Sequence, residues 1–270
     1  MTDDLTLAAE LVREAGVLAR RMLDDGLETH HKTSVSDVVS AADHAAEELV
    51  VSRLRAERPE DGLIGEEGTA DSSTATGGRT WYIDPVDGTY NFLFGLPYWC
   101  AAIALGERPD PDGPIVAILG AVYHPFADEL WLGGRDHPTT CNGVPVPPLV
   151  DAPLSQLSVA SYLHPATLPD DGAREPLMAI LQRAATVRML GSGSIELASV
   201  AAGRLGAWAQ HDSLDWDWLP GVALVTAAGG VTEVIQHRGH RWHIAGNAQA
   251  VAEISSAIKS SAMKSSAIIG

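Results

Sequence analysis

The sequence lacks the marks of several common protein classes. It has only two cysteines, Cys100 in an apolar run and Cys141 in a turn-like Thr-Cys-Asn-Gly segment, which form neither a zinc pattern nor a disulfide framework. No apolar run approaches the roughly 18 residues of a membrane span. The Met1-Thr-Asp-Asp start has neither the basic nor the apolar region of a signal peptide. We therefore expect a cytoplasmic protein with no membrane partner.

Basic residues are also scarce. The chain has 18 Lys and Arg against 35 Asp and Glu, which gives a formal net charge of −17. Nucleic-acid backbones are bound by clustered Lys and Arg, so we expect no nucleic-acid partner. A phosphorylated small molecule is compatible with this charge, provided that bound cations reverse the local sign.

Several catalytic and nucleotide-binding signatures are missing. The chain has no His-Glu-x-x-His, no Gly-Lys-Ser, no Gly-x-Gly-x-x-Gly after a strand and no serine-hydrolase nucleophile motif. Zincin, P-loop, Rossmann and serine-hydrolase functions are therefore excluded. His237, His240 and His243 lie three residues apart, but the residues between them favour an exposed hairpin over a metal site.

The remaining composition and patterning indicate a folded α/β protein, with 46% apolar and 20% charged residues. Periodicity and capping predict helices at about 4–23, 43–58, 175–185, 191–202 and 217–228, and strands at about 63–65, 81–84, 98–105, 115–123, 129–132, 157–162, 187–190 and 205–209. We divide the chain into an N-terminal α+β half (1–148), a C-terminal α/β half (149–256) and a low-complexity tail (257–270). The serine-alanine repeats near that tail recur every five residues, which is not a helical period.

One stretch indicates chemistry most strongly, Trp81-Tyr-Ile-Asp-Pro-Val-Asp-Gly-Thr-Tyr-Asn-Phe92. Its apolar start predicts a buried strand, and Pro85, which has no N–H for a strand ladder, predicts that pairing stops there. Asp84 and Asp87 are then expected at the carboxyl end of a sheet, where α/β proteins tend to bind ligands. Gly88 permits close backbone approach, and amides beside it are available to an anion.

Two further acidic segments lie at the ends of apolar elements, Glu66-Glu67 and Asp217. Oxygen ligands without nearby Cys or His suit a hard cation, Mg²⁺ first and Mn²⁺ or Ca²⁺ next. Two such ions can hold the attacking and leaving oxygens of a displacement at phosphorus. A compact α/β protein can bring these ends to one crevice, so together they predict a metal-phosphate site.

Each segment also has a purely structural interpretation. Asp-Pro-x-Asp-Gly is a common turn sequence, Glu66-Glu67 is compatible with a solvated loop, and Asp217 with a helix N-cap. Gly191-Ser-Gly-Ser194 resembles an anion-binding helix start, although glycine-serine loops are common.

These segments, in this order, resemble the inositol monophosphatase family of Mg²⁺-dependent, lithium-sensitive phosphatases. The resemblance rests on three blocks: Gly65-Glu-Glu-Gly68, the stretch from Trp81 to Phe92, and Trp216-Asp217 followed by Gly229-Gly230. Lys32 with Asp37, Ala42-Asp43 and Ala245-Gly246-Asn247 also resemble family segments. The resemblance spans about residues 5–254. It implies a layered α-β-α-β-α sandwich of the inositol monophosphatase and sugar phosphatase type, commonly dimeric.

The resemblance also implies roles for individual residues around two or three Mg²⁺ ions. The implied metal ligands are Glu66, Asp84 and the carbonyl of Val86 for the first ion, Asp84, Asp87 and Asp217 for the second, and Glu66 for a third. The implied catalytic residues are Glu66 and Thr89, which position and deprotonate the attacking water, and Asp43, hydrogen-bonded to Thr89. The implied phosphate-binding groups are the amides of Gly88 and Thr89. The implied substrate-binding residues are Asp87, Gly193, Gln210 and Asp217.

Departures from the family pattern concern the alcohol more than the phosphate. Gln210 lies where inositol-hydrolysing members carry a glutamate, and an amide has no charge. Gly193 leaves the alcohol pocket roomy, and Pro220 is expected in the first turn of a helix. We expect hydrolysis of a small phosphate monoester similar to inositol 1-phosphate. The alternatives are histidinol phosphate, fructose bisphosphate, NADP or phosphoadenosine phosphate as substrate, or a regulatory binding protein that retains the fold.

Overall fold

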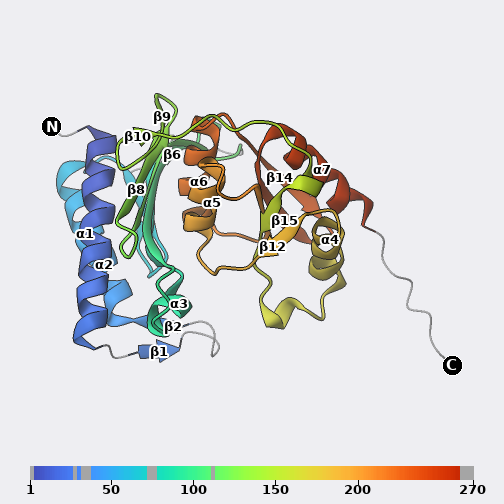
Figure 1. The fold of residues 1–270 in the computed structure, drawn as a ribbon. Helices are drawn as coiled ribbons and strands as arrows, with labels where there is room; N and C mark the ends of the chain where they lie inside the picture. Colours follow the sequence, from blue (N-terminus) through green and yellow to red (C-terminus); the bar gives the residue numbers. More distant parts are fainter. Residues whose placement is uncertain (1–2, 27–28, 32–37, 72–77, 111–112, 262–270) are drawn as a thin grey trace.

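The chain forms five stacked layers of helices and sheets (Figure 1). A computed structural model describes residues 3–26, 29–31, 38–71, 78–110 and 113–261. Helices α1 (Asp4–Asp25) and α2 (Ala41–Glu57) cover one face of an eight-stranded sheet, and α5 (Gly193–Ala201) and α6 (Asp215–Ala227) cover the other. A five-stranded sheet follows, covered on its outer face by α4 (Asp171–Leu181) and α7 (Ala248–Ser260). The predicted α-β-α-β-α sandwich is confirmed.

The eight-stranded sheet is antiparallel except for one pair of strands. Its order is β10 (Val144–Pro145), β9 (His137–Cys141), β8 (Glu129–Gly134), β7 (Val116–His124), β6 (Cys100–Glu107), β5 (Arg79–Asp87), β3 (Gly62–Gly65) and β4 (Ala70–Asp71). Only β3 and β5 run parallel, so their carboxyl ends meet at one edge, and Gly65 pairs with Ile83. This parallel pair brings the residue after β3 beside the acidic end of β5.

The five-stranded sheet is built from the second half of the chain. Its order is β12 (Thr186–Arg188), β11 (Ser158–Ala160), β13 (Ala207–His211), β15 (His240–Gly246) and β14 (Val231–His237). The remaining short elements are β1 (Thr29–His31) paired with β2 (Val38–Ser40), α3 (Thr89–Leu93), and the 3₁₀ turns at Leu154–Gln156 and Pro165–Thr167.

The two halves share one core through α6. This helix belongs to the second half of the chain but packs against β6 and β7 of the first sheet. Gly120 on β7 permits the contact, because a Cβ there would lie 2.3 Å from the carbonyl oxygen of Pro220. The close approach fixes the position of α6, and with it the position of Asp217 in its first turn.

Strand β5 differs from its prediction. It continues through Pro85 to Asp87, where pairing was expected to have stopped. Asp84 pairs with Ala102, the register then shifts, and Asp87 pairs with Cys100. The bulge accommodates the missing N–H of the proline. Both carboxylates therefore project from a paired, buried backbone and not from a surface turn.

Three smaller predictions are also wrong. Pro220 is the sixth residue of α6 and lies in its second turn. Helix α7 runs to Ser260, so the start of the serine-alanine repeats is helical. The hairpin of β14 and β15 is not uniformly exposed, because His243 is 0% exposed. Lys32, Asp37 and the end of the predicted tail lie outside the described residues.

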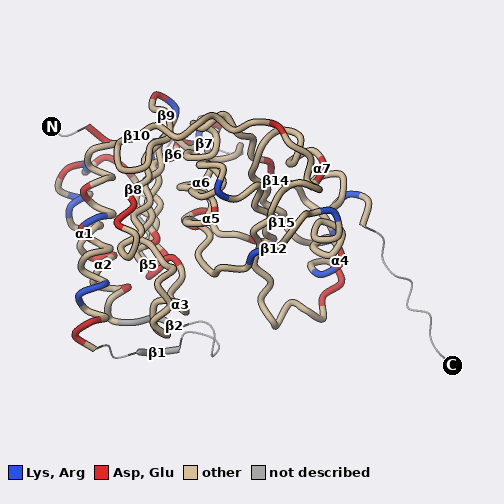
Figure 2. The backbone as a smooth tube through the Cα atoms, viewed as in Figure 1, with Lys and Arg blue, Asp and Glu red and all other residues tan. Residues whose placement is uncertain are grey.

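Charged residues of both signs alternate along the outer helices. Figure 2 shows basic and acidic residues side by side on α1 and α2. Arg53 of α2, for example, contacts Glu10, Glu14 and Glu57. Within the described residues, no helix is both long and apolar enough to cross a bilayer.

Candidate active site

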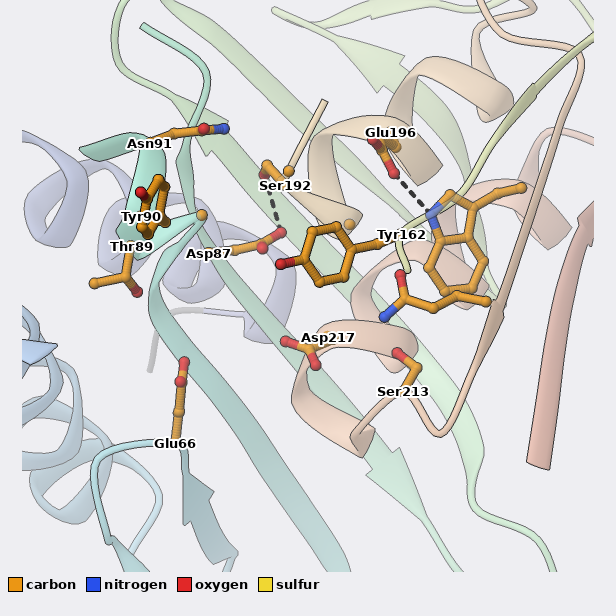
Figure 3. Close-up of a pocket in the computed structure, with 15 residues that line it drawn as sticks. Glu66, Asp87, Thr89, Tyr90, Asn91, Tyr162, Ser192, Glu196, Ser213 and Asp217 are labelled. Atoms are coloured by element: carbon orange, nitrogen blue, oxygen red, sulfur yellow. Dashed lines mark hydrogen bonds between the residues drawn. The ribbon is translucent and has the colours of Figure 1, made fainter. Parts of the chain in front are cut away.

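Three aspartates from two elements converge on one point. Asp84 and Asp87 lie at the end of β5, and Asp217 lies in the first turn of α6; each offers a carboxylate oxygen, and these oxygens lie within 4.8 Å of one another. Glu66 joins them from the turn after β3, where its amide donates to Ile83 O at 3.1 Å. Figure 3 shows Glu66, Asp87 and Asp217 facing a common opening. The interpretations of Asp84 and Asp87 as part of a surface turn and of Glu66 as part of a solvated loop are therefore wrong. Asp217 is not an N-cap either, since Leu214 is the N-cap of α6.

Burial and mutual repulsion oppose ionisation of this cluster. Burial, followed by the charges of Glu66, Asp87 and Asp217, raises the pKa of Asp84 well above its ordinary value. Burial, followed by the charges of Asp87 and Glu66, raises the pKa of Asp217 to about 8. The neutral forms are favoured because each ionised carboxylate would add to several nearby negative charges at a poorly solvated place.

The described residues around the cluster supply no positive charge. Among the described residues that line the pocket there is no Lys, Arg or His. Buried carboxylates are normally paired with basic groups or bound to metals. The donor set is oxygen only, which suits Mg²⁺ and similar hard cations. The arrangement fits a metal centre and does not fit a network of ion pairs.

Asp87 is held by the start of α5. Its Oδ2 accepts hydrogen bonds from Ser194 N at 2.6 Å and Ser192 Oγ at 3.0 Å. The Gly191-Ser-Gly-Ser194 segment is thus an anion-binding helix start, and the anion it binds is a carboxylate of the protein itself. These bonds partly offset the effect of burial, which still raises the pKa of Asp87.

Thr89 links the acidic cluster to α2. Its Oγ1 lies 3.3 Å from Asp43 Oδ1 and 3.0 Å from Val86 O, and its single proton can serve one of these acceptors at a time. Gly88, the N-cap of α3, has φ +96°, and a Cβ there would lie 2.9 Å from Gly191 O. The first amides of a helix have no partner within it, so those at Gly88 and Thr89 suit an anion. Asp43 and Thr89 are therefore adjacent, as the resemblance implied.

Glu47 was missed by the sequence analysis. It is 4% exposed, and its two oxygens accept the amides of Glu67 at 2.8 Å and Thr69 at 3.1 Å. Gly65 makes room for it, since a Cβ there would lie 2.4 Å from Glu47 Oε2. Glu47 therefore positions the turn that carries Glu66. Its spacing of four residues from Asp43 on one helix was the available signal.

The pocket beside the acidic cluster is also lined by residues that the sequence analysis missed. The cavity has a volume of about 270 Å³, which suits a small metabolite. Gly193 and Gln210 line it as predicted, together with Tyr90, Tyr162, Trp208 and Ser213. A Cβ at Gly193 would meet only Trp208, at 3.8 Å, so this wall does leave room. Figure 3 shows Tyr162 beside the carboxylates.

Glu196 is a fourth acidic side chain among the described residues that line the pocket, with Glu66, Asp87 and Asp217. It is 1% exposed, and its oxygens accept Leu190 N at 2.9 Å and Trp208 Nε1 at 3.0 Å. Burial is the largest cause that raises the pKa of Glu196, to about 7. Nothing in the local sequence distinguished it, because a glutamate within a helix is usually solvated.

Asn91 joins the two halves of the site. Its Nδ2 donates to Tyr98 O at 2.8 Å and to Leu190 O at 2.7 Å, the second bond crossing from the first half of the chain to the second. The asparagine in the Trp81 to Phe92 stretch therefore has a structural role, which is to align β5 with the start of α5.

The chain resembles known proteins both in sequence and in fold. A model of the inositol monophosphatase family matches residues 1–265. The chain is similar to an inositol-1-monophosphatase of Rhizobium meliloti, 34% identical over 196 residues that cover 72% of this chain and 71% of the relative. It is similar to inositol monophosphatase 2 of Homo sapiens, 29% identical over 231 residues covering 83% and 77%. The solved extragenic suppressor protein suhB from Bartonella henselae has a TM-score of 0.83 at 25% identity, covering 95% of this chain and 98% of that one.

Removing one acceptor from Glu47 is expected to weaken cation binding. In Glu47→Gln the side-chain NH₂ group replaces one carboxylate oxygen and cannot accept a hydrogen bond from a backbone amide. The turn that carries Glu66 therefore loses one of its two hydrogen bonds to Glu47, those from the amides of Glu67 and Thr69. We expect Mg²⁺ affinity to fall by about 10–100-fold, as for other residues that orient metal ligands. The measurement is the Mg²⁺ concentration that half-maximally raises the melting temperature. Glu48→Gln, at the exposed neighbour on α2, is the control; equal affinities in the two variants would contradict the role of Glu47.

The metal-free protein is expected to lose stability as pH rises. The pKa of Asp217 is about 8 in the folded state against an ordinary 3.8, so its neutral form favours folding. This contribution is complete below about pH 3.8 and is lost as pH rises through about 8. Asp217→Asn cannot ionise and should show a shallower decline in unfolding free energy between pH 4 and 8 in chelator. Parallel curves for the variant and the parent would refute this, and the exposed Asp136→Asn serves as control.

Proposed function

We propose, since this chain belongs to the inositol monophosphatase family, that it is a phosphoric monoester hydrolase that uses Mg²⁺ to release inorganic phosphate from a small-molecule phosphate monoester. The carrying observation is the cluster of Asp84, Asp87 and Asp217 with Glu66 beside it. Asp84 and Asp87 are buried and the other two are partly buried, at a pocket whose described lining residues include no Lys, Arg or His. Such a cluster is stable in its charged form only with cations bound.

The ligand assignment follows the elements of the site. Glu66, Asp84 and the Val86 carbonyl would hold one ion, Asp84, Asp87 and Asp217 a second, and Glu66 would contribute to a third. Bound Mg²⁺ polarises the phosphoryl oxygens and lowers the pKa of water in its coordination shell. Asp84 is shared because it lies between the turn after β3 and the first turn of α6.

The protein itself supplies the proton route and the phosphate-binding groups. Glu66 orients the attacking water. The water gives a proton to Thr89 Oγ1 as Thr89 passes its own proton to Asp43 Oδ1, 3.3 Å away. The amides of Gly88 and Thr89, at the start of α3, bind the nonbridging phosphate oxygens. Water attacks phosphorus directly, in line with the leaving alcohol, and no phosphoenzyme forms.

The part of the pocket that would bind the alcohol favours a small polyol phosphate similar to inositol 1-phosphate. At position 210 it offers the neutral amide of Gln210 in place of a carboxylate. Gln210 and Ser213 offer neutral hydrogen-bonding groups, and Gly193 leaves space. Histidinol phosphate, fructose bisphosphate, NADP and phosphoadenosine phosphate are the alternative substrates. We further propose a cytoplasmic homodimer, which light scattering of the purified protein would test.

The metal ligands are tested by Asp87→Asn. The variant keeps an oxygen for Ser192 and Ser194, so we expect the fold to persist by circular dichroism. Phosphate release with Mg²⁺ should fall by more than about 100-fold, because one ligand loses its charge. Chelation should abolish the parent's activity, Mg²⁺ should restore it, and Li⁺ should inhibit it.

Two results would overturn that assignment. A folded Asp87→Asn protein with parental activity would exclude Asp87 as a ligand, and full activity after exhaustive chelation would exclude metal catalysis. Asp215→Asn, two residues before Asp217 on α6, is the matched control and should retain activity. If the parent turned over no phosphate monoester in a broad panel, the binding-protein alternative would be favoured.

Gln210 is expected to set the preference among alcohols. In Gln210→Glu a carboxylate becomes available to substrate hydroxyls, and hydrogen bonds to charged groups are stronger than neutral ones. The ratio of kcat/KM for inositol 1-phosphate to that for the other panel members should rise by about 10-fold, equivalent to about 1.4 kcal/mol. Gln236→Glu, on the exposed side of β14, should leave the ratio unchanged. An unchanged ratio in Gln210→Glu would count against the role of Gln210.

A further inference from the structure

A second group of metal-ligating side chains lies at the edge of the five-stranded sheet. It consists of His211, the last residue of β13, Asp212, which follows it, and His240, the first residue of β15. His211 pairs with Trp242, and His240 lies two residues before Trp242 on the same face of the sheet. The two imidazole rings are 4.9 Å apart between centroids. None of the three is among the described residues that line the catalytic pocket.

The donor atoms of this group converge on one carboxylate oxygen. Asp212 Oδ2 lies 3.2 Å from His211 Nδ1 and 2.5 Å from His240 Nδ1. The other oxygen, Oδ1, accepts the amide of Arg241 at 2.9 Å, which holds the carboxylate in this orientation. Asp212 adopts φ +52°, a left-handed conformation that aspartate tolerates better than most residues. Two ring nitrogens therefore face the same anionic oxygen.

The outer nitrogen of His240 is also fixed. Its Nε2 lies 2.9 Å from Asp170 Oδ2, and Asp170 Oδ1 accepts the amide of Gly172 at the start of α4. A carboxylate on one imidazole nitrogen, with the other nitrogen free to bind a metal, is the usual surrounding of histidine ligands. A metal ion at the cluster would face Nδ1 of His240, and the ring proton would then stay on Nε2 beside Asp170. Asp170 is brought to this position from the loop before α4, far from His240 in sequence.

We propose that His211, Asp212 and His240 form a metal site, separate from the catalytic carboxylates, for a borderline transition-metal ion of the Zn²⁺ type. Two imidazole nitrogens and one carboxylate oxygen suit Zn²⁺ and disfavour Mg²⁺, which takes oxygen ligands. The donor atoms lie within 4.8 Å of one another. Tetrahedral Zn²⁺ needs them about 3.3 Å apart, which side-chain rotation can reach. Asp212 is half exposed, so water completes the coordination.

The ion would link two segments, the connection from β13 to α6 and the start of β15, and Asp170 ties the loop before α4 to them through His240. The first segment begins after Gln210 and ends at the helix that carries Asp217. A metal ion at this site would therefore stabilise the segment between Gln210 and Asp217, both of which line the pocket, without itself lying in the pocket.

The competing occupant of the site is a proton. Hydrogen bonding to Asp212, the largest cause, together with that to Asp170 raises the pKa of His240, which makes a plain ion-pair bridge the alternative structure. A bridge of that kind holds no metal. The two states differ in a property that can be measured directly, which is nitrogen coordination of a bound ion.

The test uses the full chain without a histidine tag, stripped of metal and then held in excess Mg²⁺. Zn²⁺ binding is followed by calorimetry, and Cu²⁺ is used as a probe whose pulsed electron paramagnetic resonance reports imidazole ligands. The proposal expects one site with imidazole coordination in the parent and in Asp87→Asn, whose substitution affects only the oxygen-ligand centre. His211→Asn and His240→Asn should each weaken Zn²⁺ binding at that site by at least about 10-fold and remove the signal of two coordinated imidazoles. His237→Asn, on the same hairpin but outside the cluster, is the matched control.

Three outcomes would overturn the proposal. They are an absence of imidazole coordination in the parent, a two-imidazole signal that persists in His240→Asn, and an equal loss of Zn²⁺ affinity in His237→Asn. If His211→Asn fails to fold by circular dichroism, Asp212→Asn replaces it. That variant keeps the turn but lowers the charge of the ligand oxygen, and it should also weaken Zn²⁺ binding. These results do not depend on phosphatase activity, so failure of this proposal and failure of the proposed function remain distinguishable.

Discussion

The mutual repulsion of buried carboxylates is the constraint on which the rest of the structure depends. Asp84, Asp87 and Asp217 are brought together beside a pocket whose described lining residues include no basic side chain, and burial raises the pKa of each. Folding alone gains nothing from this arrangement, because charged groups in a protein interior are destabilising unless they are paired. The surrounding elements hold the carboxylates in place for a cation, as expected where stability is traded for function.

The holding contacts come from both halves of the chain. Glu47 anchors the turn that carries Glu66, and the start of α5 binds one oxygen of Asp87. Asn91 ties the end of β5 to the segment before α5, across the centre of the molecule. The site is therefore a property of the whole sandwich, because its acidic cluster and the rest of its pocket draw on elements from both halves of the chain.

The sequence predicts that Glu66, Asp84, Asp87 and Asp217 lie at the ends of apolar elements and meet in one crevice, and the structure brings them together. The parallel pairing of β3 and β5, which brings Glu66 beside Asp84, was not predicted. The remainder depends on contacts between residues far apart in the chain. Pro85 was expected to end a strand, but a bulge keeps the strand paired to Asp87. Glu47 and Glu196 look like ordinary helical glutamates until tertiary packing buries them. The cluster of His211, Asp212 and His240 arises from the register of β13 and β15, which no local pattern specifies.

The most direct test of the central claim is a crystal structure of the protein grown with Mn²⁺, with anomalous scattering used to locate the ions. Mn²⁺ takes the same oxygen ligands as Mg²⁺ and is visible by its anomalous signal. We predict two or more anomalous peaks within bonding distance of Glu66, Asp84, Asp87, Asp217 and the Val86 carbonyl. A well-ordered structure with these carboxylates unbound, at Mn²⁺ concentrations that support full activity, would contradict the account.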